Sequence, residues 1–404
     1  MLAPHRVYIV ATVVFVVIAA FSVHIFRNKD VFVTNEIGNN PHRIPQLTLE
    51  ETITSLFQSL KLDPAASAYI DPSGTHHEGS KNPVWKEPLG KKVLIVDIDT
   101  RKPTGKNELL NPGRIDWEHI GGEGGGMVSN SILNHYMYAM IHGYEYMFYQ
   151  ARDMDDRHNT WVLPHVVREL LPKYQFVVVL DADAMVPHLE IPLEWMFNRW
   201  GIKEETSIAL PWDTEEFRSG GSISADSKGL RVLNTGLVIA QNSTNTLEML
   251  EAWRDCPTET RYKGCAEWKF NWSHEQRAFF EYLRYDYNDT IVAIPCEEAV
   301  GWPGFREEML APGSFDDDIS DCNGTFIRHY TARGKPQVRE AGGISVMQLM
   351  TEVIQKSILS NPNKVWYKEP KHNPDPPKIT RPKEQDKSDQ VKEEKGIHIE
   401  IDVA

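Results

Sequence analysis

The chain has few basic residues and few cysteines, and each shortage argues against a class of protein. Lysine and arginine number 43 against 57 aspartates and glutamates, which gives a formal net charge of -14. Nucleic-acid binding needs basic patches to meet the phosphate backbone, so this balance argues against a nucleic-acid partner. There are only four cysteines, and they show neither the Cys-x-x-Cys nor the Cys/His spacing of a structural zinc site.

Internal repeats are also lacking, and the one glycine-rich stretch has no known phosphate-binding spacing. Residues 121–126 read Gly-Gly-Glu-Gly-Gly-Gly, which matches neither the dinucleotide-binding motif nor the P-loop. We interpret this stretch as a flexible loop. With 404 residues, 41% of them hydrophobic, the chain can hold one large or two ordinary domains with a sizeable core.

One long apolar run lies near the N-terminus. Val7 to Phe26 is interrupted only by Thr12, Ser22 and His24, and about 20 such residues span a bilayer. A cleaved signal peptide is the alternative, for which Ala19 and the alanine after it offer weak support. Because the run is longer than a typical signal core, we expect a retained anchor over residues 7–26, with residues 1–6 as a cytoplasmic tail.

Glycosylation sequons and cysteines indicate which side of the membrane the rest of the chain occupies. Each sequon is weak evidence alone, but four follow the anchor, and they begin at Asn242, Asn271, Asn288 and Asn323. Four cysteines suit two disulfides, for which three pairings are possible. The simplest pairing joins Cys256 to Cys265 and Cys296 to Cys322. Disulfides and sequons together predict a luminal, type II membrane protein.

The part of the chain after the anchor divides into three by composition. Residues 27–90 are rich in proline, asparagine, serine and histidine and read as a stem, with one helix from Thr48 to Leu60. That helix opens with the capping-box pattern Thr48-x-x-Glu51. We expect a catalytic domain over residues 91–360. Residues 361–404 are rich in charge and proline and poor in apolar residues, which predicts a disordered tail.

Strands and helices alternate through the first half of the predicted domain. Apolar periodicity predicts helices over 130–142 and 160–171, the first ended by Gly143 as a C-cap. Strands are predicted over 93–98, 144–149 and 176–180. This alternation predicts an α/β fold whose sheet is parallel with right-handed crossovers. Shorter elements follow, namely strands at 208–211, 237–240 and 291–294 and helices at 247–253 and 275–283.

Asp181 and Asp183 come directly after the strand Phe176 to Leu180. Ligands of open α/β sheets bind outside the carboxyl ends of strands. Two acids one residue apart repel each other unless a cation lies between them. We therefore interpret the pair as a divalent metal site for a phosphate-bearing substrate, and a polar turn after a strand is the alternative reading.

The motifs, taken in order, resemble those of GT-A fold glycosyltransferases, and most of all glycosyltransferase family 34, with family 8 as its cousin. The resemblance covers about residues 90–340. Its pieces are Tyr138 to Tyr144, Trp161 to Ala184, Asn234-Thr235-Gly236, Glu275-Gln276 and His329 to Pro336. The resemblance implies a nucleotide-diphospho-sugar transferase fold, which is Rossmann-like with a mixed, mainly parallel sheet. It also implies transfer of galactose, mannose or another hexose from a UDP- or GDP-sugar to a glycan acceptor, with retention of configuration.

The resemblance also implies roles for single residues. Asp181, Asp183 and His329 are the expected metal ligands, and one nitrogen with two oxygens suits Mn²⁺, with Mg²⁺ as the alternative. Arg333 and Lys335 are both candidates for the family's lysine, because glycine and lysine stand farther from the histidine here than the family usually places them. The remaining candidates are Glu275 and Gln276 near the anomeric carbon, Asn234 against a sugar and His142 behind the nucleotide.

Alternatives remain for several of these residues and for the whole chain. Asn234 could only shape a turn, Glu275 and Gln276 could be ordinary first-turn residues after the N-cap candidate Ser273, and His142 could be a core histidine. The chain could be a non-catalytic subunit of a Golgi glycosyltransferase complex instead of an enzyme. A metal-dependent phosphoesterase would need more histidine and aspartate ligands than the sequence offers. We expect a Golgi enzyme, with the endoplasmic reticulum as the less favoured location.

Overall fold

The computed structural model describes residues 47–219, 221–314 and 316–369. The expected anchor over residues 7–26, and the expected tail from residue 370 onward, lie outside them. Within the described residues, no helix combines the length and the apolar character needed to cross a membrane. The chain divides into two compact units, residues 1–346 and 347–404. The elements that build the site belong to the first unit.

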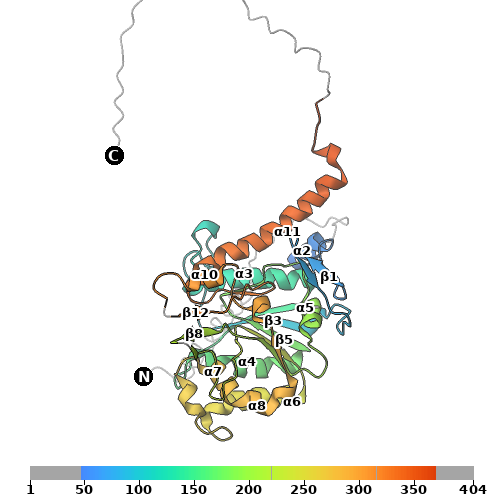
Figure 1. Cartoon of the computed structure of the whole chain (residues 1–404). Coiled ribbons are helices and arrows are strands. Elements are labelled where there is room, and N and C mark those ends of the chain that lie inside the picture. The colour runs from blue at the N-terminus through green and yellow to red at the C-terminus, as the bar shows by residue number, and fades with distance from the viewer. Residues whose placement is uncertain (1–46, 220, 315, 370–404) are drawn as a thin grey trace, which may run out of the picture. The chain divides into compact units, whose positions relative to one another are not determined.

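A six-stranded sheet forms the centre of the first unit (Figure 1), in the order β11-β7-β10-β5-β3-β4. β3 is parallel to β4 and β5, and β7 is parallel to β11, whereas β10 is antiparallel to both of its neighbours. The mixed, mainly parallel α/β sheet is therefore as predicted. The strands are β3 (Val93–Asp99), β4 (Glu145–Gln150), β5 (Phe176–Leu180), β7 (Ile208–Pro211), β10 (Leu237–Gln241) and β11 (Ile291–Ile294).

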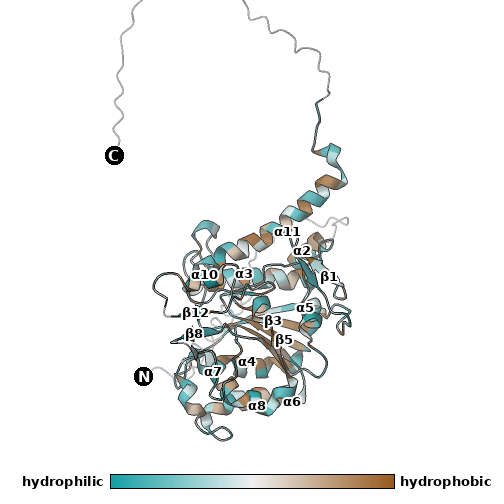
Figure 2. Cartoon of the chain, in the orientation of Figure 1, coloured by the Kyte–Doolittle hydropathy of each residue, from teal (hydrophilic) through white to brown (hydrophobic). Residues whose placement is uncertain are grey.

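Helices cover both faces of this sheet. Figure 1 shows α2 and α3 on one side and α4, α6, α7 and α8 on the other. Every residue of β5 and β10 is buried between these layers, and the central strands are accordingly the apolar ones in Figure 2. The helices are α2 (Leu49–Phe57), α3 (Gly124–His142), α4 (Val162–Leu170), α5 (Leu193–Trp200), α6 (Thr244–Asp255), α7 (His274–Ala278), α8 (Arg284–Tyr287), α9 (Cys296–Ala299), α10 (Phe305–Met309) and α11 (Val338–Ser360).

Three small sheets complete the described part of the chain. The one that matters for the site pairs β6 with β13 antiparallel, so that Ala184 lies opposite His329. This pairing brings His329 next to the segment that follows Asp181 and Asp183. The short strands are β1 (Ala68–Ile70), β2 (His76–Glu78), β6 (Ala184–Met185), β8 (Glu216–Arg218), β9 (Gly221–Ser222), β12 (Asp318–Ile319) and β13 (Arg328–His329).

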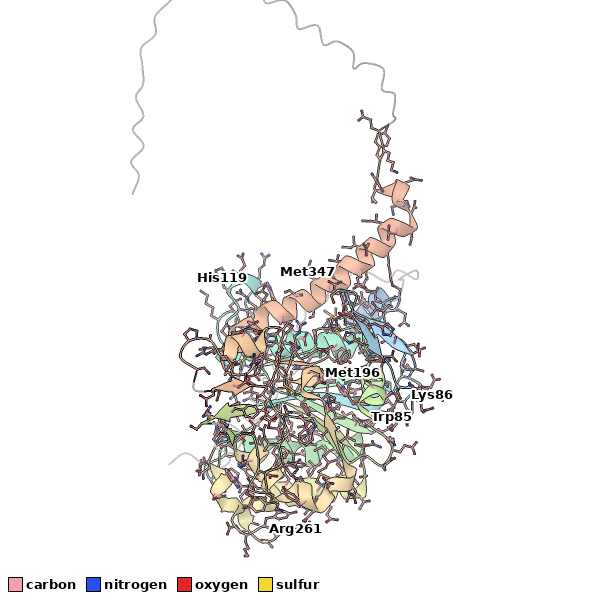
Figure 3. The ribbon with its side chains drawn as sticks, in the orientation of Figure 1. Trp85, Lys86, His119, Met196, Arg261 and Met347 are labelled. Carbon is pink, nitrogen blue, oxygen red and sulfur yellow. A yellow bond between two sulfur atoms is a disulfide. The ribbon has the colours of Figure 1, made fainter. Side chains whose placement is uncertain are left out.

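The described part of the expected stem packs against the globular unit instead of standing apart from it. Trp85 is buried, and its indole N–H donates to the carbonyl of Ile202 at 2.8 Å. The side chain of Asn198, on α5, accepts from the backbone N–H of Trp85 at 2.8 Å. Figure 3 labels Trp85 and also Met196, which lies on α5 like Asn198. The polar composition of residues 47–90 hid the few apolar side chains that anchor this segment. Its helix forms as predicted, with the Thr48–Glu51 capping box intact.

The glycine-rich stretch is part of a helix and not only a loop. α3 begins at Gly124, six residues before the predicted start, and ends as predicted with Gly143 in the left-handed region at φ 72°. A Cβ atom on Gly126 would lie 2.6 Å from the carbonyl oxygen of Gly121. The glycines therefore allow two backbone segments to approach closely. A glycine-rich sequence of this kind looks the same as that of a flexible loop.

Both predicted disulfides are present, Cys256 with Cys265 and Cys296 with Cys322. The second one ties α9, which follows β11, to the segment that leads into β13. The helix predicted over 275–283 begins one residue earlier, as α7 at His274. Ser273 is at the N-cap of α7 but its side chain makes no capping hydrogen bond, and a π-helical turn, Phe279–Leu283, continues α7 toward α8.

Candidate active site

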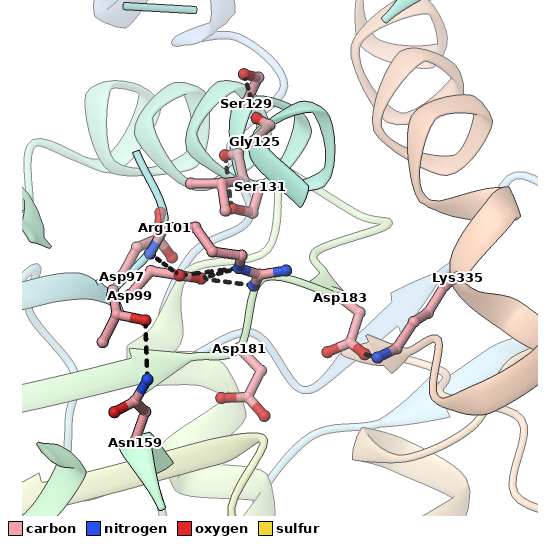
Figure 4. Close-up of polar contacts among 12 residues, drawn as sticks. Asp97, Asp99, Arg101, Gly125, Ser129, Ser131, Asn159, Asp181, Asp183 and Lys335 are labelled. Carbon is pink, nitrogen blue, oxygen red and sulfur yellow. Dashed lines mark hydrogen bonds and ion pairs between the residues drawn. The ribbon is translucent and has the colours of Figure 1, made fainter. Parts of the chain in front are cut away.

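The two acids lie where β5 leaves the sheet. The backbone N–H of Asp181 donates to the carbonyl of Gly236 at 3.0 Å, because β10 runs antiparallel and starts where β5 ends. The Asp181 side chain is 48% exposed and that of Asp183 only 12%. Figure 4 shows both carboxylates, with Asp183 pointing toward Lys335.

His329 reaches this pair from 146 residues further along the chain. Its Nε2 lies 3.1 Å from Oδ1 of Asp183 and 3.8 Å from Oδ2 of Asp181. One ligand atom from each of the three residues falls within 4.8 Å of the others. The residues predicted as metal ligands are thus brought together, with one nitrogen and two carboxylates facing a common point.

Two basic side chains offset the negative charge of the acids. Burial raises the pKa of Asp183, but His329 and Lys335 outweigh it and lower that pKa; Nζ of Lys335 is 3.6 Å from Oδ2 of Asp183. Asp181 lacks such close partners. Desolvation in the pocket raises its pKa to about 6 against the attraction of His329. The pKa values of the two acids are therefore shifted in opposite directions, and a bound cation would lower that of Asp181 further.

The Asn234-Thr235-Gly236 motif gives His329 its space. A Cβ atom at Gly236 would overlap the His329 ring and lie 2.8 Å from Nε2. Asn234 shapes the turn, since its side-chain oxygen accepts from the N–H of Gly236 at 2.8 Å. Asn234 is buried, and the amide nitrogen of its side chain donates to Asp213.

A polar cluster joins this motif to α7. The Nε2 of Gln276 donates to Asp213 at 3.1 Å, and the N–H of Thr235 donates to Oε1 of Gln276 at 2.9 Å. Asp213 also accepts from Asn234 at 3.0 Å. These bonds hold the Gln276 amide in one orientation. Asp213 was not predicted, although it follows β7 much as Asp181 follows β5.

The Glu275 residue is buried, with 4% exposure. Burial raises its pKa to about 7, and the charge of Asp181 adds to the rise. Its Oε1 accepts a long hydrogen bond, 3.4 Å, from the hydroxyl of Thr235. Through Thr235, Glu275 is connected to the turn that carries Gly236 and makes room for His329.

A cavity of about 370 Å³ opens in front of the acids, and both Asp181 and Asp183 line it together with Lys335. Asp99 and Arg101, which the sequence reading missed, come from the end of β3 and also line it. Arg101 forms a paired contact with Asp99, with N–O distances of 2.6 and 2.9 Å (Figure 4). The rule that placed Asp181, a polar residue after a parallel strand, also applies to Asp99.

The polar side of helix α3 holds the segment that follows the acids. His135 bridges Oδ1 of Asp97, at 2.6 Å, and the carbonyl of Ala184, at 2.9 Å. Asn134 both donates to and accepts from the backbone of Val186. No sequence pattern marked His135, because its partners are 38 and 49 residues away.

Two predicted site residues lie elsewhere. Arg333 donates to the backbone carbonyls of Glu308 and Ala311, so Lys335 is the basic residue that faces the acids. His142 lies in a second cavity, lined also by Lys61, Tyr144 and Glu194, and its Nε2 contacts the carbonyl of Leu189 at 2.8 Å. Burial lowers the pKa of His142 to about 3, which fits a neutral core histidine.

Within the described residues there is one other group with metal-ligand spacing, Asp116, Glu118 and His119. All three side chains are exposed, and Figure 3 labels His119 at the surface. Exposed acids of this kind are solvated, so this group is not a second candidate site.

The geometry agrees with a family comparison. The model of the galactosyl transferase GMA12/MNN10 family matches residues 118–294, which include α3, both acids and Gln276. Xyloglucan 6-xylosyltransferase 1 of Arabidopsis thaliana is 30% identical over 127 residues, which are 30% of this chain and 25% of that protein. The chain thus matches about a quarter of the length of this curated relative.

Solved glycosyltransferases show low similarity. The enzyme involved in glycosylation of the major capsid of PBCV-1 has 12% identity and a TM-score of 0.40, covering 62% of this chain and 98% of that one. Mouse xyloside xylosyltransferase 1 has 10% identity and a TM-score of 0.33, covering 60% and 99%. The family match confirms the predicted resemblance to glycosyltransferase family 34 over residues 118–294. By this match, that segment belongs to the glycosyltransferase class.

Proposed function

We propose that this chain is a metal-dependent glycosyltransferase with the GT-A fold, which moves a hexose from a UDP- or GDP-sugar to a glycan acceptor with retention of configuration. The observation that carries the proposal is the meeting of Asp181, Asp183 and His329 at one edge of the sheet, with Lys335 beside them. A diphosphate is the substrate group that such a mixture of acids, imidazole and ammonium recognises.

The donor set fits a divalent cation. The ligand atoms lie within 4.8 Å of one another, and Nε2 of His329 is the ring nitrogen that faces the acids, 3.1 Å from Oδ1 of Asp183. Two carboxylates and one imidazole suit Mn²⁺ better than Ca²⁺, with Mg²⁺ as the alternative. When bound, the metal would neutralise the negative charge that builds on the departing diphosphate.

The chain's own residues bind and orient the donor. Lys335 offers positive charge at the mouth of the cavity, and Arg101, held by Asp99, lies on its other wall. Gln276 is held in a fixed orientation by Asp213 and Thr235. Preorganised polar groups of this kind stabilise developing charge without rearranging during the reaction. The roles of Glu275 and Gln276 near the anomeric carbon belong to this proposal.

We further propose that the enzyme resides in the Golgi membrane, anchored by residues 7–26 with the catalytic domain in the lumen. The support is the apolar length of that run, the two disulfides and the position of the sequons. All four sequon asparagines, Asn242, Asn271, Asn288 and Asn323, are exposed, as glycosylation requires. The partners proposed are the nucleotide sugar, a glycan acceptor and, in a complex, other glycosyltransferases.

The test is turnover of a panel of UDP- and GDP-hexoses by the luminal fragment, with and without Mn²⁺. Asp183→Asn should lower the rate of transfer or donor hydrolysis by at least roughly a hundredfold, because the ligand set is broken. Asp318→Asn makes the same change on the surface, at a side chain that is 52% exposed, and should keep the rate. An Asp183→Asn protein with the wild-type rate would remove this metal site from the mechanism. A wild type that turns over no donor would reject the proposal in favour of a non-catalytic subunit. The anomeric configuration of the product, read by NMR, tests retention.

A further inference from the structure

Two large aromatic side chains stand exposed on one short loop. Phe270 is 63% exposed and Trp272 is 86% exposed, and their loop runs from the 3-10 helix Cys265–Lys269 to α7. Single exposed aromatic residues are common on protein surfaces. Here two exposed aromatic residues occur within three positions, next to the start of the helix that carries Glu275 and Gln276. This clustering calls for an explanation.

Stacked rings connect this loop to the donor cavity. His158 lines the cavity, and its ring lies flat on the ring of His274, with centroids 3.7 Å apart and planes 2° from parallel. The ring of Trp272 meets that of His274 edge-on at 5.9 Å. A continuous row of rings therefore leads from the cavity wall outward to Trp272.

The loop is held at both ends, although its aromatic rings face solvent. On one side the N–H of His158 donates to the carbonyl of Lys269 at 2.8 Å, and the indole of Trp161 donates to the carbonyl of Trp268 at 3.1 Å. On the other side the indole of Trp253 donates to the carbonyl of Glu275 at 2.9 Å. A surface that is ordered before binding loses less conformational entropy when a ligand arrives.

We propose that Trp272 and Phe270, with His274 and His158 behind them, form the acceptor platform of this enzyme, an inference that rests on the proposed function. A pyranose ring has one face made of C–H groups and an edge of hydroxyls. The C–H face can lie on an exposed aromatic ring and remove apolar surface from water, while the hydroxyls stay solvated. The occupant is a glycan chain rather than a protein, because the row of rings ends at the cavity that would hold the donor sugar.

One other occupant is possible, since Asn271 belongs to a sequon. A glycan attached there would lie next to Trp272 and could cover the same ring. The experiment therefore includes Asn271→Gln, which removes that glycan and leaves the aromatic residues in place.

The experiment measures binding to the luminal fragment by calorimetry, with Mn²⁺ and UDP or GDP present. The probes are mannotetraose and cellotetraose, two oligosaccharides of different backbone shape. Trp272→Ala should weaken the better-bound oligosaccharide by about tenfold, the effect of losing one stacking ring. Trp117→Ala removes an indole that is 42% exposed and does not line the cavity, so it should bind the oligosaccharide as the wild type does.

Nucleotide binding distinguishes a failure of the acceptor platform from a failure of the proposed function on which it rests. Trp272→Ala should bind UDP or GDP with wild-type affinity, whereas a wild type that binds neither nucleotide contradicts the proposed function itself. The acceptor platform is overturned if Trp272→Ala keeps the oligosaccharide affinity, or if the wild type binds the nucleotide but neither oligosaccharide. It is also overturned if Asn271→Gln binds the oligosaccharide about tenfold more tightly than wild type, because the chain's own glycan would then be the occupant of the ring in the wild type.

Discussion

His329 can stand beside the acids only because residue 236 has no side chain. The imidazole packs against the Cα of Gly236 at the start of β10, and the adjacent carbonyl of Gly236 accepts the N–H of Asp181. One glycine thus fixes both the backbone next to the first acid and the position of the histidine. A turn preference explains the glycine less well than this steric contact does.

Gly236→Ala should therefore displace His329. We expect affinity for Mn²⁺ to fall by about 10- to 100-fold, since a ligand is moved, and stability to fall by about 1–3 kcal/mol from overpacking. Titration of the metal-free protein with Mn²⁺ measures the first effect and urea unfolding the second. Gly221→Ala is the matched control, because a Cβ atom there meets nothing within 4 Å. Equal Mn²⁺ affinity in Gly236→Ala and wild type would contradict the steric role.

Glu275 makes stability depend on pH. Burial raises its pKa from 4.5 to about 7 in the folded protein, so the folded state holds the proton more tightly than the unfolded chain does. Its contribution to stability is then full below about pH 4.5 and is lost as pH rises through about 7. The size of this loss is about 3 kcal/mol for a shift of this order.

Glu275→Gln should remove that dependence, because the amide stays neutral. Relative to wild type, the variant should gain about 2.5 kcal/mol in free energy of unfolding between pH 5 and pH 8, because part of the full effect is already lost at pH 5. Urea unfolding of both metal-free proteins at the two pH values measures the difference. If the two proteins show parallel pH dependence, Glu275 is ionised in the fold and the expected origin of its pKa shift is wrong.

At the scale of elements, helix α3 holds the segment from β6 to α5 in place by hydrogen bonds. Four side chains on its buried polar side contact backbone groups of residues 184–191, and these side chains are Asn134, His135, Tyr138 and His142. His135 is the one next to the acids, and Asp97 and Tyr146 hold it in turn, because Tyr146 donates to Asp97 at 2.5 Å. Ala184, which His135 contacts, also pairs with His329 across the β6–β13 ladder.

His135→Ala should loosen the acids without touching a ligand. We expect Mn²⁺ affinity to fall by about tenfold or more, as outer partners of metal ligands usually produce. Tyr138→Phe is the control, since it removes a similar buried bond to the carbonyl of Ile191, 2.7 Å long, farther from the acids. It should lose stability but keep its Mn²⁺ affinity within about twofold. If the two variants lower Mn²⁺ affinity equally, the effect comes from general destabilisation and not from positioning.

At the scale of the whole molecule, the expected anchor and the expected luminal location make one prediction together. The full-length chain should stay in the membrane fraction after carbonate extraction, because about 20 apolar residues insert stably. Endoglycosidase should increase its electrophoretic mobility, since four exposed asparagines stand in sequons. A chain released by carbonate, or one with unchanged mobility, would contradict this topology. Replacing all four asparagines by glutamine controls for the enzyme treatment.

Local patterns in the sequence determined several features without any knowledge of the fold. Five consecutive buried apolar residues before Asp181 marked a strand and placed the acids at its end. The Thr48–Glu51 box and Gly143 marked helix ends, since capping is a property of a few adjacent residues. The even cysteine count indicated two disulfides but allowed three pairings, of which the simplest is the one present.

Only the tertiary structure decided which of these features share a space. The antiparallel direction of β10 brings Gly236 to Asp181, and the β6–β13 ladder brings His329 to Asp183 across 146 residues. Such pairings leave no periodic trace in the chain, because they depend on strand order and not on neighbouring residues. The same reason explains why His135 and Asp213 went unnoticed, and why the structure was needed to choose Lys335 over Arg333.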